Sequence, residues 1–149
     1  MKEVVIGFLG CGNVGGGVWS LLTGFSREIA HRDSLSIRIK RVLVRDVNKT
    51  RACGGPHELL TTNADDVVSD PEISIVVEFM GGEQPATDYM LRALENQKKR
   101  PGDLDLAVTY VNLAQHYAAQ DENDARIAAC LDKAMERMDS PDAVWEYSY

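Results

Sequence analysis

Short apolar runs alternate with helical stretches over roughly the first two thirds of the chain. The runs are rich in β-branched residues and predict strands at Val4–Leu9, Ile37–Val44 and Ile73–Phe79. The intervening stretches predict helices from Val14 to about His31, from about Ala64 to Ser69 and from Gln84 to Gln97. This alternation is typical of βαβ units on a parallel sheet, and the apolar third strand indicates burial on both faces.

The pattern changes after the polar segment Lys98–Asp103. Asp103 is a plausible N-cap for a helix to about Ala119, and Asp121–Asp124 breaks that helix before a second one that ends near Met138. Ser140-Pro141-Asp142 then begins a third helix that reaches Tyr149. The sequence therefore predicts an α/β fold: a partial parallel sheet of about three strands in residues 1–98, and an all-α helical hairpin in residues 99–149.

The composition is that of a soluble globular protein, with 44% hydrophobic and 26% charged residues. No apolar run approaches the roughly 20 residues that a membrane span requires. A net charge of −7 argues against nonspecific binding to nucleic acid, which needs clustered Lys and Arg. We expect a cytoplasmic protein with neither a nucleic acid nor a membrane as its partner.

The potential metal ligands are scattered along the chain. They lack CxxC pairing and metal-ligand spacing, and comprise Cys11, Cys53, Cys130, His31, His57 and His116. We expect neither a metal site nor a disulfide, with reduced thiols and with packing or surface roles for the histidines.

The sharpest chemical signal is the motif Gly10-Cys11-Gly12-Asn13-Val14-Gly15, which lies between the first predicted strand and the first predicted helix. Gly10 permits a tight turn, Gly12 lets a pyrophosphate approach the backbone, and Gly15 lets the helix pack close to the strand. The amides and the positive dipole end of the helix then face the phosphates. In this context the motif predicts a dinucleotide site, although glycines also serve plain turns.

The end of the second predicted strand bears on the choice of cofactor. Arg45 ends that strand, Asp46 follows it, and Lys49 and Arg51 are close by. A basic side chain here accepts the 2′-phosphate of NADP, whereas an acidic one binds the ribose hydroxyls of NAD. The pattern favours NADP, but Asp46 would favour NAD if Arg45 turned outward. Lys49 and Arg51 also fit an ordinary solvated loop.

These residues carry a resemblance that covers Val4 to about Gln97. The blocks IGFLGCGNVGGGVWSLL, IRIKRVLVRDVNKTRA, ELLTTNADDVVSDPEISIVVEFMGG and PATDYMLRALENQKK look like the amino-terminal part of homoserine dehydrogenase. The resemblance implies a Rossmann-type domain, with the pyrophosphate cradled by Gly10, Gly12, Asn13, Val14 and Gly15. It also implies that Arg45 meets the adenosine ribose or its phosphate, and that the nicotinamide lies beside Met80, Gly81 and Gly82. The Gly-Gly pair also fits a simple turn.

The chain departs from that family after Gln97. Where the family has a strand and an Ala-Asn-Lys segment beside the nicotinamide, this sequence has KRPGDLDLAV. We find no match to the family's catalytic positions or to its substrate region, and therefore assign no catalytic residue. The resemblance implies the cofactor-binding part of an enzyme that interconverts homoserine and aspartate semialdehyde. The abrupt join near Lys98 suggests a fusion, a truncated gene or a chimera.

The helical part looks more loosely like a tetratricopeptide repeat, through the spacing of Tyr110, Leu113, Ala114 and Tyr117. An ordinary hairpin packed on the half-sheet is the alternative. The other hypothesis for function is an interaction module in which this segment docks a protein partner, with its aromatic end uncovered at Trp145, Tyr147 and Tyr149. An uncovered sheet edge also favours a homo-oligomer.

Overall fold

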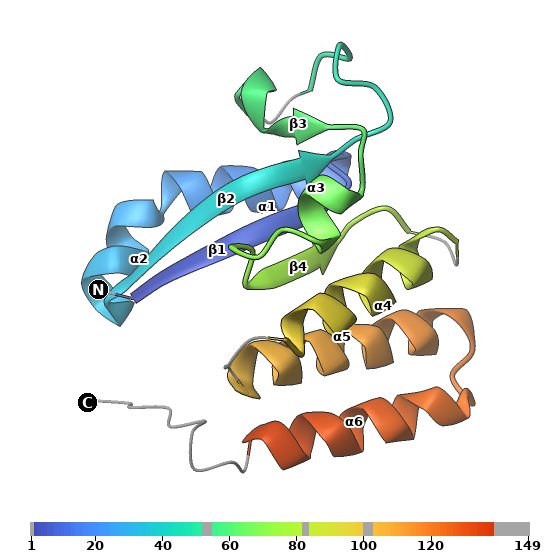
Figure 1. Ribbon diagram of the computed structural model, residues 1–149. Coiled ribbons are helices and arrows are strands. Elements are labelled where there is room, and N and C mark those ends of the chain that lie inside the picture. Colours follow the sequence, from blue (N-terminus) through green and yellow to red (C-terminus); the bar gives the residue numbers. More distant parts are fainter. Residues whose placement is uncertain (1, 52–54, 82–83, 100–102, 139–149) are drawn as a thin grey trace.

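Four parallel strands form one sheet in the computed structural model, which describes residues 2–51, 55–81, 84–99 and 103–138 (Figure 1). In order across the sheet they are β3 (Leu60–Thr61), β2 (Leu35–Leu43), β1 (Lys2–Leu9) and β4 (Ile75–Glu78). β1 pairs in parallel with β2 on one side and with β4 on the other. The first strand of the chain is therefore a central strand of the sheet.

The alternation of side chains along β1 explains this central position. Ile6 and Phe8 enter one buried cluster together with Trp19, whereas Val5 and Leu9 enter a second cluster on the opposite face. Successive strand residues point to opposite faces, so a run that is apolar at every position must be covered on both. β1 meets that requirement, and both clusters depend on it.

Helices cover the two faces of the sheet (Figure 1). α1 (Asn13–Gly24) and α2 (Ser26–Asp33) lie on one face. α3 (Asp65–Val68) and α4 (Ala86–Gln97) lie on the other, and a short 3-10 helix at His57–Leu59 precedes β3. This three-layer arrangement of helices around a parallel sheet confirms the predicted α/β, Rossmann-type fold class.

α5 (Asp103–Gln120) and α6 (Ala125–Met138) form the predicted hairpin, which lies beyond α4 (Figure 1). α5 packs against α4 and β4, and it supplies buried apolar residues to the cluster that contains Val5 and Leu9: Leu106, Tyr110, Leu113 and Tyr117. Among the described residues of α6, only Ala134 is buried. The four positions that suggested a tetratricopeptide repeat are all buried, and the rings of Tyr110 and Tyr117 also contact α6 through Lys133 and Arg126. Our division into domains at residue 98 stays a prediction.

Two details differ from the sequence predictions, and a third lies where the structure describes no residues. The sheet has one strand more than expected, because β3 is only two residues long and gives no alternating pattern. The helix expected from Val14 to His31 is two helices, which meet at Phe25. The helix expected after Ser140 lies outside the described residues.

Two further findings concern only the residues that the structure describes. Their helices include none with the length and apolar character to cross a bilayer. They also contain no group of three or more His, Cys, Asp or Glu side chains placed to hold a metal ion.

Buried polar side chains join α5 to the rest of the fold. The Gln97 side chain, at the end of α4, donates to the carbonyl of Ser74 at 2.6 Å and accepts from the Thr109 hydroxyl at 2.5 Å. Gln97 and Thr109 are 4% and 3% exposed. Because a buried amide without partners costs roughly 1–3 kcal/mol, this chain of bonds favours one register of α5 against α4.

A partly buried ion pair links β2 to the segment before β4. Lys40 Nζ lies 2.7 Å from Asp70 Oδ2, and their side chains are 20% and 15% exposed. Burial alone would raise the pKa of Asp70, but the hydrogen bonds from Lys40 and from the backbone N–H of Glu72 outweigh it and lower that pKa. Hydrogen bonding to Asp70 in turn raises the pKa of Lys40.

We predict that Lys40→Met lowers the free energy of unfolding by about 1–2 kcal/mol at pH 7, because the partly buried Asp70 carboxylate loses its charged partner. The lowered pKa of Asp70 means that the pair contributes in full above the carboxyl's ordinary pKa. Its contribution is lost as the pH falls through the lowered value. Urea unfolding at pH 7 and below pH 4 measures both effects.

The matched control is Arg32→Met, which removes an exposed pair with Asp33 on α2. Solvent and salt screen an exposed pair, so this variant is expected to unfold near the wild-type urea concentration. Two outcomes would contradict the role assigned to the partly buried pair: an equal loss of unfolding free energy in the two variants, or a loss in Lys40→Met that persists below the pKa of Asp70.

Candidate functional site

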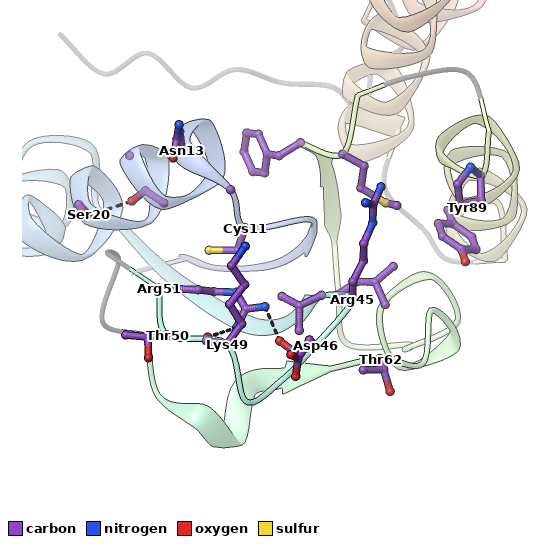
Figure 2. Close-up of a pocket in the computed structure, with 18 residues that line it drawn as sticks. Cys11, Asn13, Ser20, Arg45, Asp46, Lys49, Thr50, Arg51, Thr62 and Tyr89 are labelled. Carbon is purple, nitrogen blue, oxygen red and sulfur yellow. Dashed lines mark hydrogen bonds between the residues drawn. The ribbon is translucent and has the colours of Figure 1, made fainter.

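The carboxyl ends of β1, β2 and β4 meet at one edge of the sheet because these strands are parallel. Gly10 follows β1, Arg45 comes two residues after β2, and Met80 comes two residues after β4. The chain runs outward from β1 through β2 to β3 and then crosses to β4 on the other side of β1, and such a switch point is where open α/β sheets bind ligands. A cleft of about 900 Å³ lies there (Figure 2).

The cleft is lined by four parts of the chain: the turn after β1 with the start of α1, the end of β2 with the loop that follows it, the residue after β3, and the segment from the end of β4 into α4. Its lining comprises Cys11, Gly12, Asn13, Gly16, Gly17, Ser20, Leu43, Val44, Arg45, Asp46, Lys49, Thr50, Arg51, Thr62, Phe79, Met80, Pro85 and Tyr89. A volume of this size suits a ligand larger than a single small metabolite.

The glycine-rich turn has the geometry that the three glycines predict. Gly10 has φ +101°, and a Cβ there would lie 3.1 Å from the backbone of Phe79. A Cβ at Gly15 would lie 3.0 Å from the carbonyl oxygen of Gly10, so α1 can approach β1 this closely only without a side chain. A Cβ at Gly12 would have nothing within 4 Å. Gly12 therefore leaves open space beside the backbone, on the wall of the cleft.

The first turn of α1 presents its amides toward this space. Gly12 is the N-cap and has no side chain to bond to the amides that follow it, and the backbone ladder begins with Gly16 N–H to Gly12 at 2.8 Å. The first amides of a helix carry its positive dipole end. Asn13 lines the cleft, whereas Val14 is 69% exposed and is absent from the lining. The side chain of Val14 thus contributes little to the cleft, although its amide belongs to the first turn.

The loop after β2 is held by its own polar groups. One oxygen of the Asp46 carboxylate accepts the backbone N–H of Asn48 at 2.8 Å. The Arg51 guanidinium donates to the carbonyl oxygens of Asp46 and Lys49, at 2.5 and 2.8 Å. Arg45 and Lys49 are exposed, and both side chains extend into the cleft in Figure 2. Arg51 therefore stabilises the loop from which two other cations reach the cleft.

The residues after β4 form the far wall of the cleft. Met80 lines it, and Gly81 has φ +67°. Gly82 lies outside the described residues. Of the residues expected from the sequence, the cleft brings together Gly12, Asn13, Arg45, Lys49 and Met80. Gly10 and Gly15 shape the turn from behind.

Sequence reasoning missed several lining residues. Tyr89 fits the apolar stripe of α4 and gave no separate signal, but its side chain borders the cleft (Figure 2). Thr62 follows the unpredicted strand β3, so nothing placed it at this edge. Ser20 lies two turns into α1, on the same helix face as Gly16 and Gly17, and helical periodicity from Asn13 could have found it.

Comparison with known proteins assigns most of this region to one family. A sequence model described as "Homoserine dehydrogenase, NAD binding domain" matches residues 10–100. The homoserine dehydrogenase of Bacillus subtilis is 37% identical over 98 residues, which is 66% of this chain and 23% of that protein. That of Methylobacillus glycogenes is 43% identical over 98 residues, or 24% of its length. The chain thus spans about a quarter of the length of these curated relatives.

Solved structures agree. The homoserine dehydrogenase from Thiobacillus denitrificans aligns with a TM-score of 0.65 at 34% identity, covering 91% of this chain and 28% of that one. The Staphylococcus aureus homoserine dehydrogenase at pH 6.0 aligns with a TM-score of 0.63 at 30% identity, covering 78% and 32%. Since the family match covers more than half of the chain and includes the glycine-rich turn, this chain belongs to the homoserine dehydrogenase family and contains its NAD-binding domain.

Proposed function

We propose that the chain binds NADP in preference to NAD, in the cleft at the carboxyl edge of the sheet. The pyrophosphate lies against Gly12 and the amides at the start of α1, the adenosine end lies at the loop after β2, and the nicotinamide lies beside Met80 and Gly81. Nicotinamide dinucleotide binding itself follows from membership of the family. The placement and the preference for NADP are the new elements.

The open space at Gly12 is the observation that supports this position of the pyrophosphate. A bound pyrophosphate needs a wall without a side chain and with hydrogen-bond donors, and the turn offers both. The neighbouring glycines are closely packed against Phe79, so Gly12 alone of the motif's three glycines faces space that a ligand can fill.

The charges of the loop after β2 support a preference for NADP over NAD. Arg45 and Lys49 line the cleft, while one oxygen of Asp46 is bonded to the loop backbone. A carboxylate that caps its own turn is less available to ribose hydroxyls. Two exposed cations at that end suit the additional phosphate of NADP.

For catalysis we propose only a contribution to cofactor binding. We infer that the chain contributes the cofactor half of a homoserine dehydrogenase reaction, the interconversion of homoserine and aspartate semialdehyde. Hydride transfer also needs a substrate carbon held against the nicotinamide with a proton-handling group in reach. The segment KRPGDLDLAV stands where the family's lysine-bearing segment would be, so we assign no catalytic residue to this chain.

Gly12→Val tests the placement. The valine side chain would enter open space in the protein but occupy the position of the pyrophosphate. We expect the variant to melt close to wild type and to bind NADP more than about tenfold more weakly, a loss of at least about 1.4 kcal/mol. Calorimetric titration with NADP measures the affinity, and a thermal melt without ligand measures the fold.

Gly24→Val is the matched control. A Cβ at Gly24 also has nothing within 4 Å, but this residue ends α1 and is absent from the cleft lining. It should bind NADP like wild type. Unchanged affinity in Gly12→Val would refute the placement of the pyrophosphate.

Arg45→Ala tests the cofactor preference. Loss of one charge-assisted hydrogen bond at an exposed site should weaken NADP binding roughly tenfold, and NAD binding by less than about twofold. Titrations with the two cofactors give the ratio of their dissociation constants. Arg27→Ala, on exposed α2, is the control and should leave that ratio unchanged. A wild-type preference for NAD, or an equal loss of both cofactors in Arg45→Ala, would count against the assignment of Arg45.

A further inference from the structure

A carboxylate holds the turn that forms the far wall of the cleft. Glu78 is the last residue of β4, and its side chain is 15% exposed. Its Oε1 accepts the backbone N–H groups of Met80 and of Gly81, the latter at 2.8 Å. A carboxylate bonded to two successive amides fixes the path of the backbone between them.

A histidine from the helical hairpin lies against that carboxylate. Nδ1 of His116, on α5, lies 3.7 Å from Glu78 Oε2, and the His116 side chain is 8% exposed. Its Nε2 lies 2.7 Å from the Thr87 hydroxyl and 2.6 Å from the Gln120 side-chain nitrogen. Nε2 of the ring therefore faces Thr87 and Gln120, and Nδ1 is the nitrogen that faces Glu78.

This cluster joins the region outside the family match to the cofactor cleft. His116 lies beyond residues 10–100, where the family model matches, whereas Glu78 and Thr87 lie within it. Its position follows from the packing of α5 beside β4 and α4. Isolated buried polar groups are costly, so the complementary arrangement of Glu78, His116 and Thr87 fixes the relative position of three elements.

We propose that Glu78 and His116 are positioning residues for the nicotinamide half of the dinucleotide. Glu78 shapes the Met80–Gly81 turn, and His116 on α5 holds the Glu78 carboxylate in the orientation that bonds both amides. The inference rests on the proposed function, since it assumes that this turn borders the nicotinamide. It assigns a role at the site to a helix that follows the matched domain.

The test separates the two halves of the ligand. Glu78→Gln keeps the size of the side chain but removes the negative charge that strengthens both amide bonds, and it replaces one carboxylate oxygen by an amide nitrogen. His116→Phe keeps a ring but removes both nitrogens. Their controls are Glu28→Gln and His31→Phe on exposed α2. Each protein is titrated with NADP and with 2′-phospho-ADP-ribose, which lacks only the nicotinamide.

We expect wild type and both controls to bind NADP more tightly than 2′-phospho-ADP-ribose. In Glu78→Gln and His116→Phe, NADP affinity should fall about five- to tenfold while that for 2′-phospho-ADP-ribose changes less than about twofold. If Glu78 and His116 acted only on overall stability, the variants would lose affinity for both ligands to the same extent. Equal losses for the two ligands, or none, would therefore overturn the inference.

The outcomes also distinguish this inference from the proposed function. If wild type binds both ligands equally, the cleft holds a dinucleotide without help from the nicotinamide, and only the present inference fails. If wild type binds neither ligand, the proposed function fails as well.

Amide hydrogen exchange gives a second measurement that needs no ligand. The amides of Met80 and Gly81 should exchange about tenfold faster in Glu78→Gln than in wild type, while amides within β1 keep their protection. If His116→Phe does not fold, the role of Glu78 is decided by the exchange measurement together with the titrations of Glu78→Gln. A milder variant, His116→Gln, then decides the role of His116 in the same titrations. Unchanged exchange at Met80 and Gly81 would contradict the role given to Glu78.

Discussion

Parallel pairing on both sides of β1 is the constraint on which the site depends. Because β2 and β4 run in the same direction as β1, the segments that follow all three strands meet at one edge of the sheet. The turn after β1 must then reverse the chain beside the backbone of Phe79, with no room for a side chain at Gly10 or Gly15. This tight turn brings Gly12 and Asn13, at the start of α1, to the wall of the cleft.

Much of this arrangement could be predicted from the sequence. The strand at Val4–Leu9 and its glycine-rich turn form a local signal, since the spacing of three glycines and the apolar run on one side are set by backbone sterics alone. The helical hairpin was equally readable, because its pattern repeats over many residues. The placement of Arg45 after β2 needed only the position of that strand's end.

The rest depended on contacts between distant segments. β3 consists of Leu60 and Thr61, and two residues carry no periodicity, so only pairing with β2 identifies them as a strand. The helical pattern of the sequence continues across Phe25, so the pattern alone predicts one helix where the structure has α1 and α2. The partnership of His116 with Glu78 joins residues that are 38 positions apart, and a scattered histidine gave no sign of it.

The central place of β1 has a consequence for synthesis on the ribosome. β1 is made before its two neighbours, which are completed only when residues 43 and 78 have been added. Until then one or both edges of an apolar strand are open, and the cluster around Val5 and Leu9 lacks the α5 residues that complete it. Open strand edges and unburied apolar surface favour aggregation of a nascent chain. The segment that carries β1 therefore stays prone to aggregation during translation until β2, β4 and α5 have been made.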